Sequence, residues 1–365
     1  MADEENAYED VVLVDQLPSN SWVEGFTIRP NGLGLVSRLD RPELYSLDLL
    51  NPDAEPVLVH TFPNATGLVN LCQMEGRHDE YVIISGNVDL DKIDFRDFVL
   101  WHVAFIQSDG TEGADGQQNQ QQQQQQQQQE AVRVTKLAEM PEAGCCIGVM
   151  PASERTLIVA DNGKSCIWCV DVATGASSLL LADPTMEPAS GDDAFALNRL
   201  RYGGGYVWFA NTSVGTLCRF PVRTIDTTVR PRDGGDAEVQ TTTLEAAGPV
   251  EVLVDDIQHC DGLVLTPDSK TAYTASYMAG LLWRIEFDET EGRWVTRVVR
   301  SRLVSPTAVE LRYDEATGRP RLFVVCCGGI EVGWINEDDR KSWSDLANIN
   351  QAVTVSVTVT TEIVQ

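Results

Sequence analysis

Six polar side chains recur along the chain, each just ahead of an apolar segment. The two clearest copies are EGFTIRP at Glu24–Pro30 and DGLVLTP at Asp261–Pro267. Each begins with a carboxylate and leads through a turn into a second apolar segment, a pattern typical of a β-hairpin. Four weaker copies begin at Thr66, Cys145, Asn198 and Thr307. If the six starts converge, they bring acid, amide, hydroxyl and thiol groups together at one site.

Three members of this set could hold a hard cation. Ca²⁺ and Mg²⁺ prefer several oxygen ligands on rigid elements, and Glu24, Asn198 and Asp261 carry suitable oxygens. The alternative is that these groups form hydrogen bonds with backbone amides and water. Metal binding at this place therefore stays one of two interpretations.

Other residues near these starts could take part in catalysis or binding. His259 lies two residues before Asp261, and an imidazole could act there as a general base or a hydrogen-bond donor. A surface-loop histidine is the alternative. We expect His259, Asp261 and Glu24 to be the catalytic candidates. The candidates for substrate contact are Trp22, Thr66, Cys145, Asn198, Tyr202, Tyr277, Thr307 and Trp334.

The elements that must position these residues are repeated β-hairpins. Six units of about 40 to 50 residues plus insertions predict a six-bladed β-propeller with four-stranded antiparallel blades, although a β-sandwich is the alternative fold. The innermost strands would line a central channel and bring the six starts to one mouth. We expect a single domain over residues 10–365. Apolar strands at 10–17 and 353–364 could complete one blade from the two ends of the chain.

Composition narrows the function classes. The chain has 365 residues, is 43% hydrophobic and carries a net charge of −28. This charge argues against nucleic acid and anionic membrane partners. No secretory signal or long apolar span is visible, so we expect a cytoplasmic protein. The motifs of serine hydrolases, P-loop proteins and dinucleotide-binding proteins do not occur. Cys166 and Cys169 form a CxxC motif, but on a strand they face opposite sides, which disfavours a redox or zinc site.

Two motif groups resemble known families. Residues 22–26, 198–200 and 261–268 resemble the inner-strand motifs of the SMP-30/gluconolactonase-like propellers. In that family one Glu, two Asn and one Asp bind a divalent cation, and the Asp also serves in lactone hydrolysis. The resemblance implies such roles for Glu24, Asn198 and Asp261, whereas Cys145 stands in place of the remaining Asn.

A longer stretch is similar to a fungal branch of this propeller group. WVEGFTIRPNGLGLVSRLDRPELYSLD at 22–48, ISGNVDL at 84–90 and WHVAF at 101–105 carry the similarity. This branch includes the hetero-Diels-Alderases of tropolone sesquiterpenoid biosynthesis. The resemblance implies a cofactor-free pericyclase that joins an o-quinone methide to a humulene-type alkene in a [4+2] cycloaddition. Metal-dependent lactone hydrolysis and non-catalytic metabolite binding are the alternatives.

Residues 109–130 contain a glutamine tract, Gln117–Gln129, interrupted only by Asn119. Such a segment buries little apolar area, so we predict a disordered loop between two strands. Deleting Gln117–Gln129 should leave folding and turnover nearly unchanged. A drop in melting temperature of more than a few degrees would show that the tract belongs to the folded core.

Overall fold

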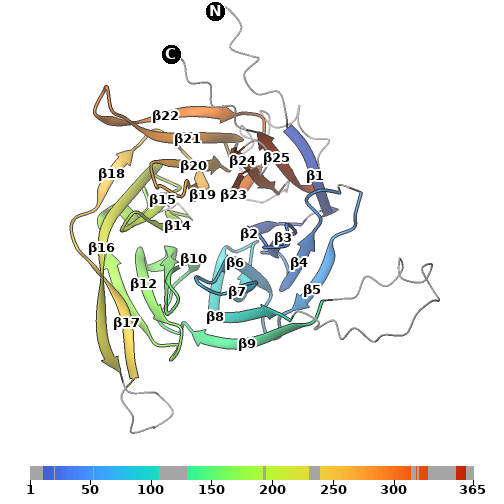
Figure 1. Ribbon diagram of the computed structural model, residues 1–365, viewed down its shortest axis with the longest axis horizontal. Helices are drawn as coiled ribbons and strands as arrows, with labels where there is room; N and C mark the ends of the chain where they lie inside the picture. Colours follow the sequence, from blue (N-terminus) through green and yellow to red (C-terminus); the bar gives the residue numbers. More distant parts are fainter. Residues whose placement is uncertain are drawn as a thin grey trace, which may run out of the picture.

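The computed structural model describes residues 11–19, 21–51, 53–106, 130–191, 195–229, 239–313, 318, 320–327 and 351–358. Within these ranges the chain forms six antiparallel sheets arranged around one axis (Figure 1). The predicted six-bladed β-propeller is therefore confirmed. Short 3-10 turns, η2 (Asn162–Lys164) and η3 (Pro184–Met186), are the helical elements of the described residues. No helix in these ranges is long and apolar enough to cross a membrane.

Each blade begins with its innermost strand and proceeds outward. The first two blades contain β2 (Val23–Ile28), β3 (Gly34–Arg38), β4 (Glu43–Leu47), β5 (Val57–Thr61), then β6 (Gly67–Gln73), β7 (Glu80–Asp89), β8 (Asp94–Phe105) and β9 (Val132–Glu139). The third contains β10 (Cys146–Ser153), β11 (Thr156–Asp161), β12 (Cys166–Asp171) and β13 (Ser177–Ala182).

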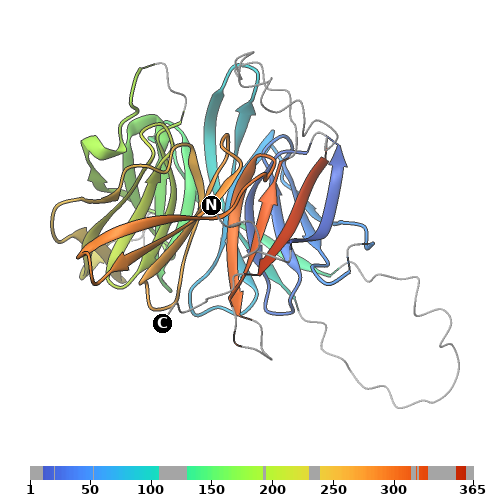
Figure 2. The ribbon, with the colours of Figure 1, turned by 90° about the horizontal axis from the view of Figure 1, so that it is seen from above.

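The fourth blade contains β14 (Leu197–Gly203), β15 (Tyr206–Asn211), β16 (Thr216–Val229) and β17 (Val239–Ala246), and β18 (Glu251–Val254) also pairs with β16. The fifth contains β19 (Cys260–Leu265), β20 (Thr271–Ser276), β21 (Leu281–Asp288) and β22 (Arg293–Arg300). Seen from the side, the blades stand around one axis, and the teal β7–β8 hairpin rises beyond its neighbours at one face (Figure 2).

The sixth blade joins the two ends of the chain. It contains β23 (Pro306–Tyr313), β24 (Pro320–Cys326), β25 (Gln351–Thr358) and, on the outside, β1 (Val11–Ser19). β1 pairs antiparallel with β25, from Val11 opposite Val357 to Ser19 opposite Gln351. The prediction that the terminal strands complete one blade is confirmed. Closure also removes two sheet edges that would otherwise be free to pair with other chains.

All six inner strands carry a β-bulge near their start. In the first blade, Val23 pairs with Arg38 and Gly25 with Ser37, so Glu24 is the extra residue. Similar register shifts occur in β6, β10, β14, β19 and β23. Gly262 has no room for a side chain, because a Cβ there would lie 2.8 Å from the Cα of Ala308 in the next blade. A bulge turns one side chain out of the regular in-and-out alternation of the strand. The six bulges therefore change which side chains face the channel near the starts of the inner strands.

Two turns and one insertion test the local predictions. The β14–β15 hairpin turns at Gly204 and Gly205, whose φ angles of 62° and 80° favour glycine. Most of the glutamine-rich segment lies outside the described residues. Glu130, which the prediction placed in the disordered loop, instead forms an ion pair with Arg29 of the first blade. The ion pair with buried Arg29 thus holds Glu130 against the first blade.

Arg29 links the first two blades through buried charges. Its Nη2 and Nε donate to both carboxylate oxygens of Asp79 at 2.7 and 3.1 Å, and the guanidinium lies 3.5 Å from the ring centre of Phe105. Burial raises the pKa of Asp79, but hydrogen bonds from Arg29 and Tyr81 and the charge of Arg29 outweigh it, so the pKa is lowered overall.

Asp79→Asn should therefore destabilise the propeller by about 3 kcal/mol at pH 7, because it leaves Arg29 buried without its bidentate partner. A carboxylate with a lowered pKa stabilises the fold above its unfolded pKa and loses this effect as pH falls through the folded value. The gap between wild type and variant, measured by chemical unfolding, should thus shrink as pH falls below about 4. Asp91→Asn, at an exposed turn, is the matched control.

Candidate functional site

The bulged positions place three of the predicted residues together at the mouth where the inner strands begin. Glu24, Asn198 and Asp261 each occupy the bulge of their strand, and each is at least nine-tenths buried. Thr307 occupies the bulge of the sixth blade, and its hydroxyl donates to the backbone oxygen of Val23 at 2.6 Å. The inner strands contact one another in a closed ring, so these positions share one level of the channel.

Arg199 lies at the centre of this level. Its Nη2 donates to Glu24 Oε1 at 2.8 Å and also to the backbone oxygen of Glu24. Its Nη1 donates to the backbone oxygen of Ile147 at 3.2 Å, and its Nε lies 3.6 Å from Asp261 Oδ1. The side chain is only 5% exposed. One guanidinium therefore connects four of the six blades.

Two oxygen atoms at this level lack a donor among the described residues. They are Asn198 Oδ1 and Asp261 Oδ1, and both are fully buried. The amide nitrogen of Asn198 is satisfied, because it donates to Thr212 Oγ1 at 3.0 Å. A buried acceptor without a donor is costly, so these two atoms are the positions where a ligand or a water molecule would gain most.

Burial shifts the acids toward their neutral forms. The pKa of Asp261 is raised well above its ordinary value by burial and by the neighbouring charge of Glu24. Burial also raises the pKa of Glu24, although Arg199 and the indole of Trp22 lower it in part. The direct ion pair with Arg199 favours the charged form of Glu24, whereas the neighbouring charge of Glu24 further raises the pKa of Asp261.

Aromatic side chains border the acids at the same mouth. Trp22 Nε1 donates to Glu24 Oε2 at 2.9 Å, and the indole stacks on Tyr277 with ring centres 5.9 Å apart. His259 is half-buried, and its backbone joins it to this mouth. Its backbone nitrogen donates to the carbonyl of Thr212, and its carbonyl accepts from the backbone nitrogen of Tyr277. The buried pair of Trp22 and Tyr277 therefore gives this mouth an apolar border next to Glu24.

Three predicted residues do not occupy these bulged positions, and a fourth is not among the described residues. Thr66 and Cys145 are not equivalent to Glu24, because the extra residues of their strands are Val69 and Ile147. Thr66 is exposed and bonds to Val88, whereas the backbone nitrogen of Cys145 donates to Asp161. Tyr202 lies at the opposite end of the channel, and Trp334 is outside the described residues. The bulge, which the sequence pattern does not reveal, shifts the register by two or three residues.

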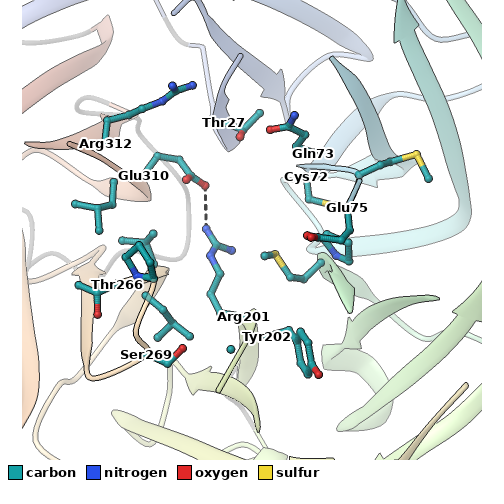
Figure 3. A pocket seen from close by; sticks show the side chains of 18 of the residues that line it. Thr27, Cys72, Gln73, Glu75, Arg201, Tyr202, Thr266, Ser269, Glu310 and Arg312 are labelled. Atoms are coloured by element: carbon teal, nitrogen blue, oxygen red, sulfur yellow. Dashed lines mark hydrogen bonds and ion pairs between the residues drawn. The ribbon is translucent and has the colours of Figure 1, made fainter. Parts of the chain in front are cut away.

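A cavity of about 810 Å³ opens at the other mouth, where the inner strands end. Figure 3 shows Arg201 reaching across it to Glu310, with Nη2 and Oε1 3.0 Å apart, while Tyr202, Thr27 and Gln73 line the wall. Burial lowers the pKa of Arg201 and raises that of Glu310, and their mutual attraction offsets part of both effects. The cavity is large enough for a small metabolite.

The residues at the first mouth do not fit a bound divalent cation while Arg199 is in place. The guanidinium already uses the oxygen atoms of Glu24 and the carbonyl of Ile147, and it lies next to Asp261. Among the described residues, no group of three or more His, Cys, Asp and Glu side chains is placed to hold a metal. The nine cysteines are all unpaired and buried, and the CxxC pair takes no part in this level.

Sequence reasoning missed Arg199, Arg201 and Glu310. The available signal was Arg199-Leu200-Arg201 within a strand of an otherwise apolar innermost layer. Charged residues at alternate positions of a buried strand need partners, and those partners must come from neighbouring inner strands.

No protein-family model matches the chain, and no curated protein sequence gives a significant match. Solved structures do match in fold. Regucalcin from Agrobacterium tumefaciens, described as a calcium-binding protein, is 16% identical, with 96% of this chain and 95% of that chain covered and a TM-score of 0.55. A luciferin-regenerating enzyme is 9% identical, with 96% and 95% covered and a TM-score of 0.58. The PQQ-bound aldose sugar dehydrogenase of Streptomyces coelicolor is 11% identical, with 95% and 98% covered and a TM-score of 0.51. These likenesses show the propeller fold alone.

The indole of Trp22 gives a test of the cluster's charge. Trp22→Phe keeps an aromatic ring against Tyr277 but removes the donor to Glu24, so it should cost about 1 to 3 kcal/mol of stability. Trp283→Phe is the matched control, because Trp283 Nε1 donates to the neutral hydroxyl of Ser276 at 2.9 Å. Chemical unfolding of both variants should show the larger loss for Trp22→Phe; equal losses would mean that Glu24 carries no charge.

Proposed function

We propose that this chain is a small-molecule enzyme of the propeller superfamily, a pericyclase that catalyses a hetero-Diels-Alder reaction without a metal. The observation that supports it best is the buried side chain of Asp261, which lies beside Arg199 and has one oxygen without a hydrogen-bond partner among the described residues; burial and the charge of Glu24 raise its pKa. The fungal resemblance supplies the substrate class: an o-quinone methide derived from a tropolone or phenol, and a humulene-type alkene.

The cycloaddition needs orientation and polarisation more than covalent help. Hydrogen bonding from the Asp261 acid to the quinone-methide oxygen withdraws electron density from the heterodiene and lowers the barrier to attack by the alkene. The buried aromatic pair of Trp22 and Tyr277 makes the surroundings of the acids apolar, which suits an apolar partner. Holding the two reactants in a near-attack arrangement can itself replace several kcal/mol of the barrier, about 7 or more in favourable cases.

The same groups could form the quinone methide from its hydroxymethyl precursor. Asp261 gives a proton to the leaving hydroxyl, and His259 takes the proton of the ring hydroxyl, so that one molecule of water is lost in total. Proton return from His259 to Asp261 restores the site. The cycloaddition then forms one C–C and one C–O bond with no further proton transfer.

A second candidate function rests on the cavity at the opposite mouth. Its volume of about 810 Å³ and its mixed lining favour the binding of a small metabolite without chemistry. Lactone hydrolysis by a divalent cation, the other alternative from the sequence, gains no support from a mouth that Arg199 occupies.

The experiment is a comparison of Asp261→Asn with wild type. EDTA-treated protein is mixed with a hydroxymethyl tropolone precursor and humulene, and the product is followed by chiral chromatography with mass detection. Wild type should accelerate the reaction and give one stereoisomer, and Asp261→Asn should lose at least tenfold in rate, because an amide cannot donate the leaving-group proton. The wild-type rate should fall as pH rises through the raised pKa of Asp261.

Asp256→Asn is the control, since this exposed carboxylate lies just ahead of the same inner strand and bonds to Thr296. A product rate and stereochemistry equal to the protein-free reaction would refute the pericyclase. Lactone hydrolysis that requires added Ca²⁺ would instead support the metal-dependent lactonase activity of the SMP-30/gluconolactonase-like propellers.

A further inference from the structure

Arg199 is surrounded by oxygen atoms in the way that a metal ion usually is. Glu24 contributes a side-chain and a backbone oxygen, and Ile147 contributes a backbone oxygen. Asp261 Oδ1 lies 3.6 Å from Nε. Asn198 Oδ1, on the residue next to Arg199, is buried without a donor among the described residues. We call these five atoms the oxygen cage.

The cage has the composition of a hard-cation site. Ca²⁺ takes six to eight oxygen ligands and accepts carboxylates, amide oxygens and backbone carbonyls together. The carboxyl groups of Glu24 and Asp261 also provide the charge that a divalent ion needs, once the ion has displaced the proton of Asp261. A guanidinium brings a single charge and directional donors, so it satisfies three of the five atoms well and leaves two poorly satisfied.

We propose that Arg199 is a built-in cation that fills a divalent-cation site, and that removing its side chain turns the oxygen cage into a binding site for Ca²⁺. Four bulged residues of the inner strands, Glu24, Ile147, Asn198 and Asp261, supply all five atoms of the cage, so the backbone of the ring sets their positions. The proposal concerns binding and does not rest on the proposed reaction.

A matched control is available in the same strand. Arg201 points into the channel two residues further along and pairs with Glu310. Its other described contact is the carbonyl of Leu200 at 3.0 Å, so a single carboxylate accompanies it. Removing Arg201 deletes the same side chain from the same strand but leaves too few oxygen atoms for a hard cation.

The test uses Tb³⁺, which replaces Ca²⁺ and emits when a nearby indole is excited. Trp22 bonds to Glu24 and would act as the donor. Arg199→Ala should gain one saturable emitting site that Ca²⁺ displaces, and its melting temperature should rise by several degrees when CaCl₂ replaces EDTA. Wild type and Arg201→Ala should show neither effect beyond weak binding to the acidic surface. Glu24→Gln combined with Arg199→Ala should abolish the new site.

Two outcomes would overturn the proposal. The first is a folded Arg199→Ala protein without a stoichiometric site. The second is a wild-type protein that binds one Ca²⁺ and loses it in Glu24→Gln, since the ion would then share or displace the guanidinium. If Arg199→Ala does not fold in EDTA, purification in CaCl₂ decides: recovery of folded protein supports the cage, and failure in both buffers refutes it.

Discussion

The centre of this propeller depends on the buried positive charge of one arginine, Arg199. Arg199 is almost completely buried, and its desolvation must be balanced by the oxygen atoms of Glu24, Asp261 and Ile147. Moving an ion from water into a protein costs several kcal/mol unless its partners compensate for it. Those partners come from different blades, so the compensation exists only when the ring is closed. The ion cluster therefore couples the geometry of the channel to the completion of the fold.

Charge continues along the channel beyond this level. Arg201 follows Arg199 on the same strand and pairs with Glu310, and Arg312 donates to the backbone oxygens of Ile28 and Arg29. Arg199 and Arg201 repel each other, which is one reason why each needs its own carboxylate. Buried arginines at successive levels of the channel thus link the inner strands, through ion pairs at Arg199 and Arg201 and through backbone oxygens at Arg312.

The sequence predicts the architecture well because the repeat is set by local patterns. Alternating apolar positions, glycine turns at 204 and 205 and the terminal strands each point to the same ring of blades. The site is harder, because its register depends on the bulges. Glu24, Asn198 and Asp261 begin their motifs at the bulge, whereas spacing alone points to Thr66 and Cys145 in place of the bulged Val69 and Ile147. The sequence does not reveal the role of Arg199 as the centre of the ion cluster, because its partners lie about 50 to 175 residues away along the chain.

The joining of β1 to β25 has a consequence for how the chain is made. β1 is synthesised long before its partner strand β25, because Val11 pairs with Val357. At usual rates of synthesis the first strand waits for tens of seconds with an unpaired edge. Contacts so distant in sequence also form slowly. Until the ring closes, the nascent chain must keep the unpaired edges of β1 from pairing with other chains. The time between the synthesis of β1 and of β25 is therefore a period in which the chain is prone to aggregate.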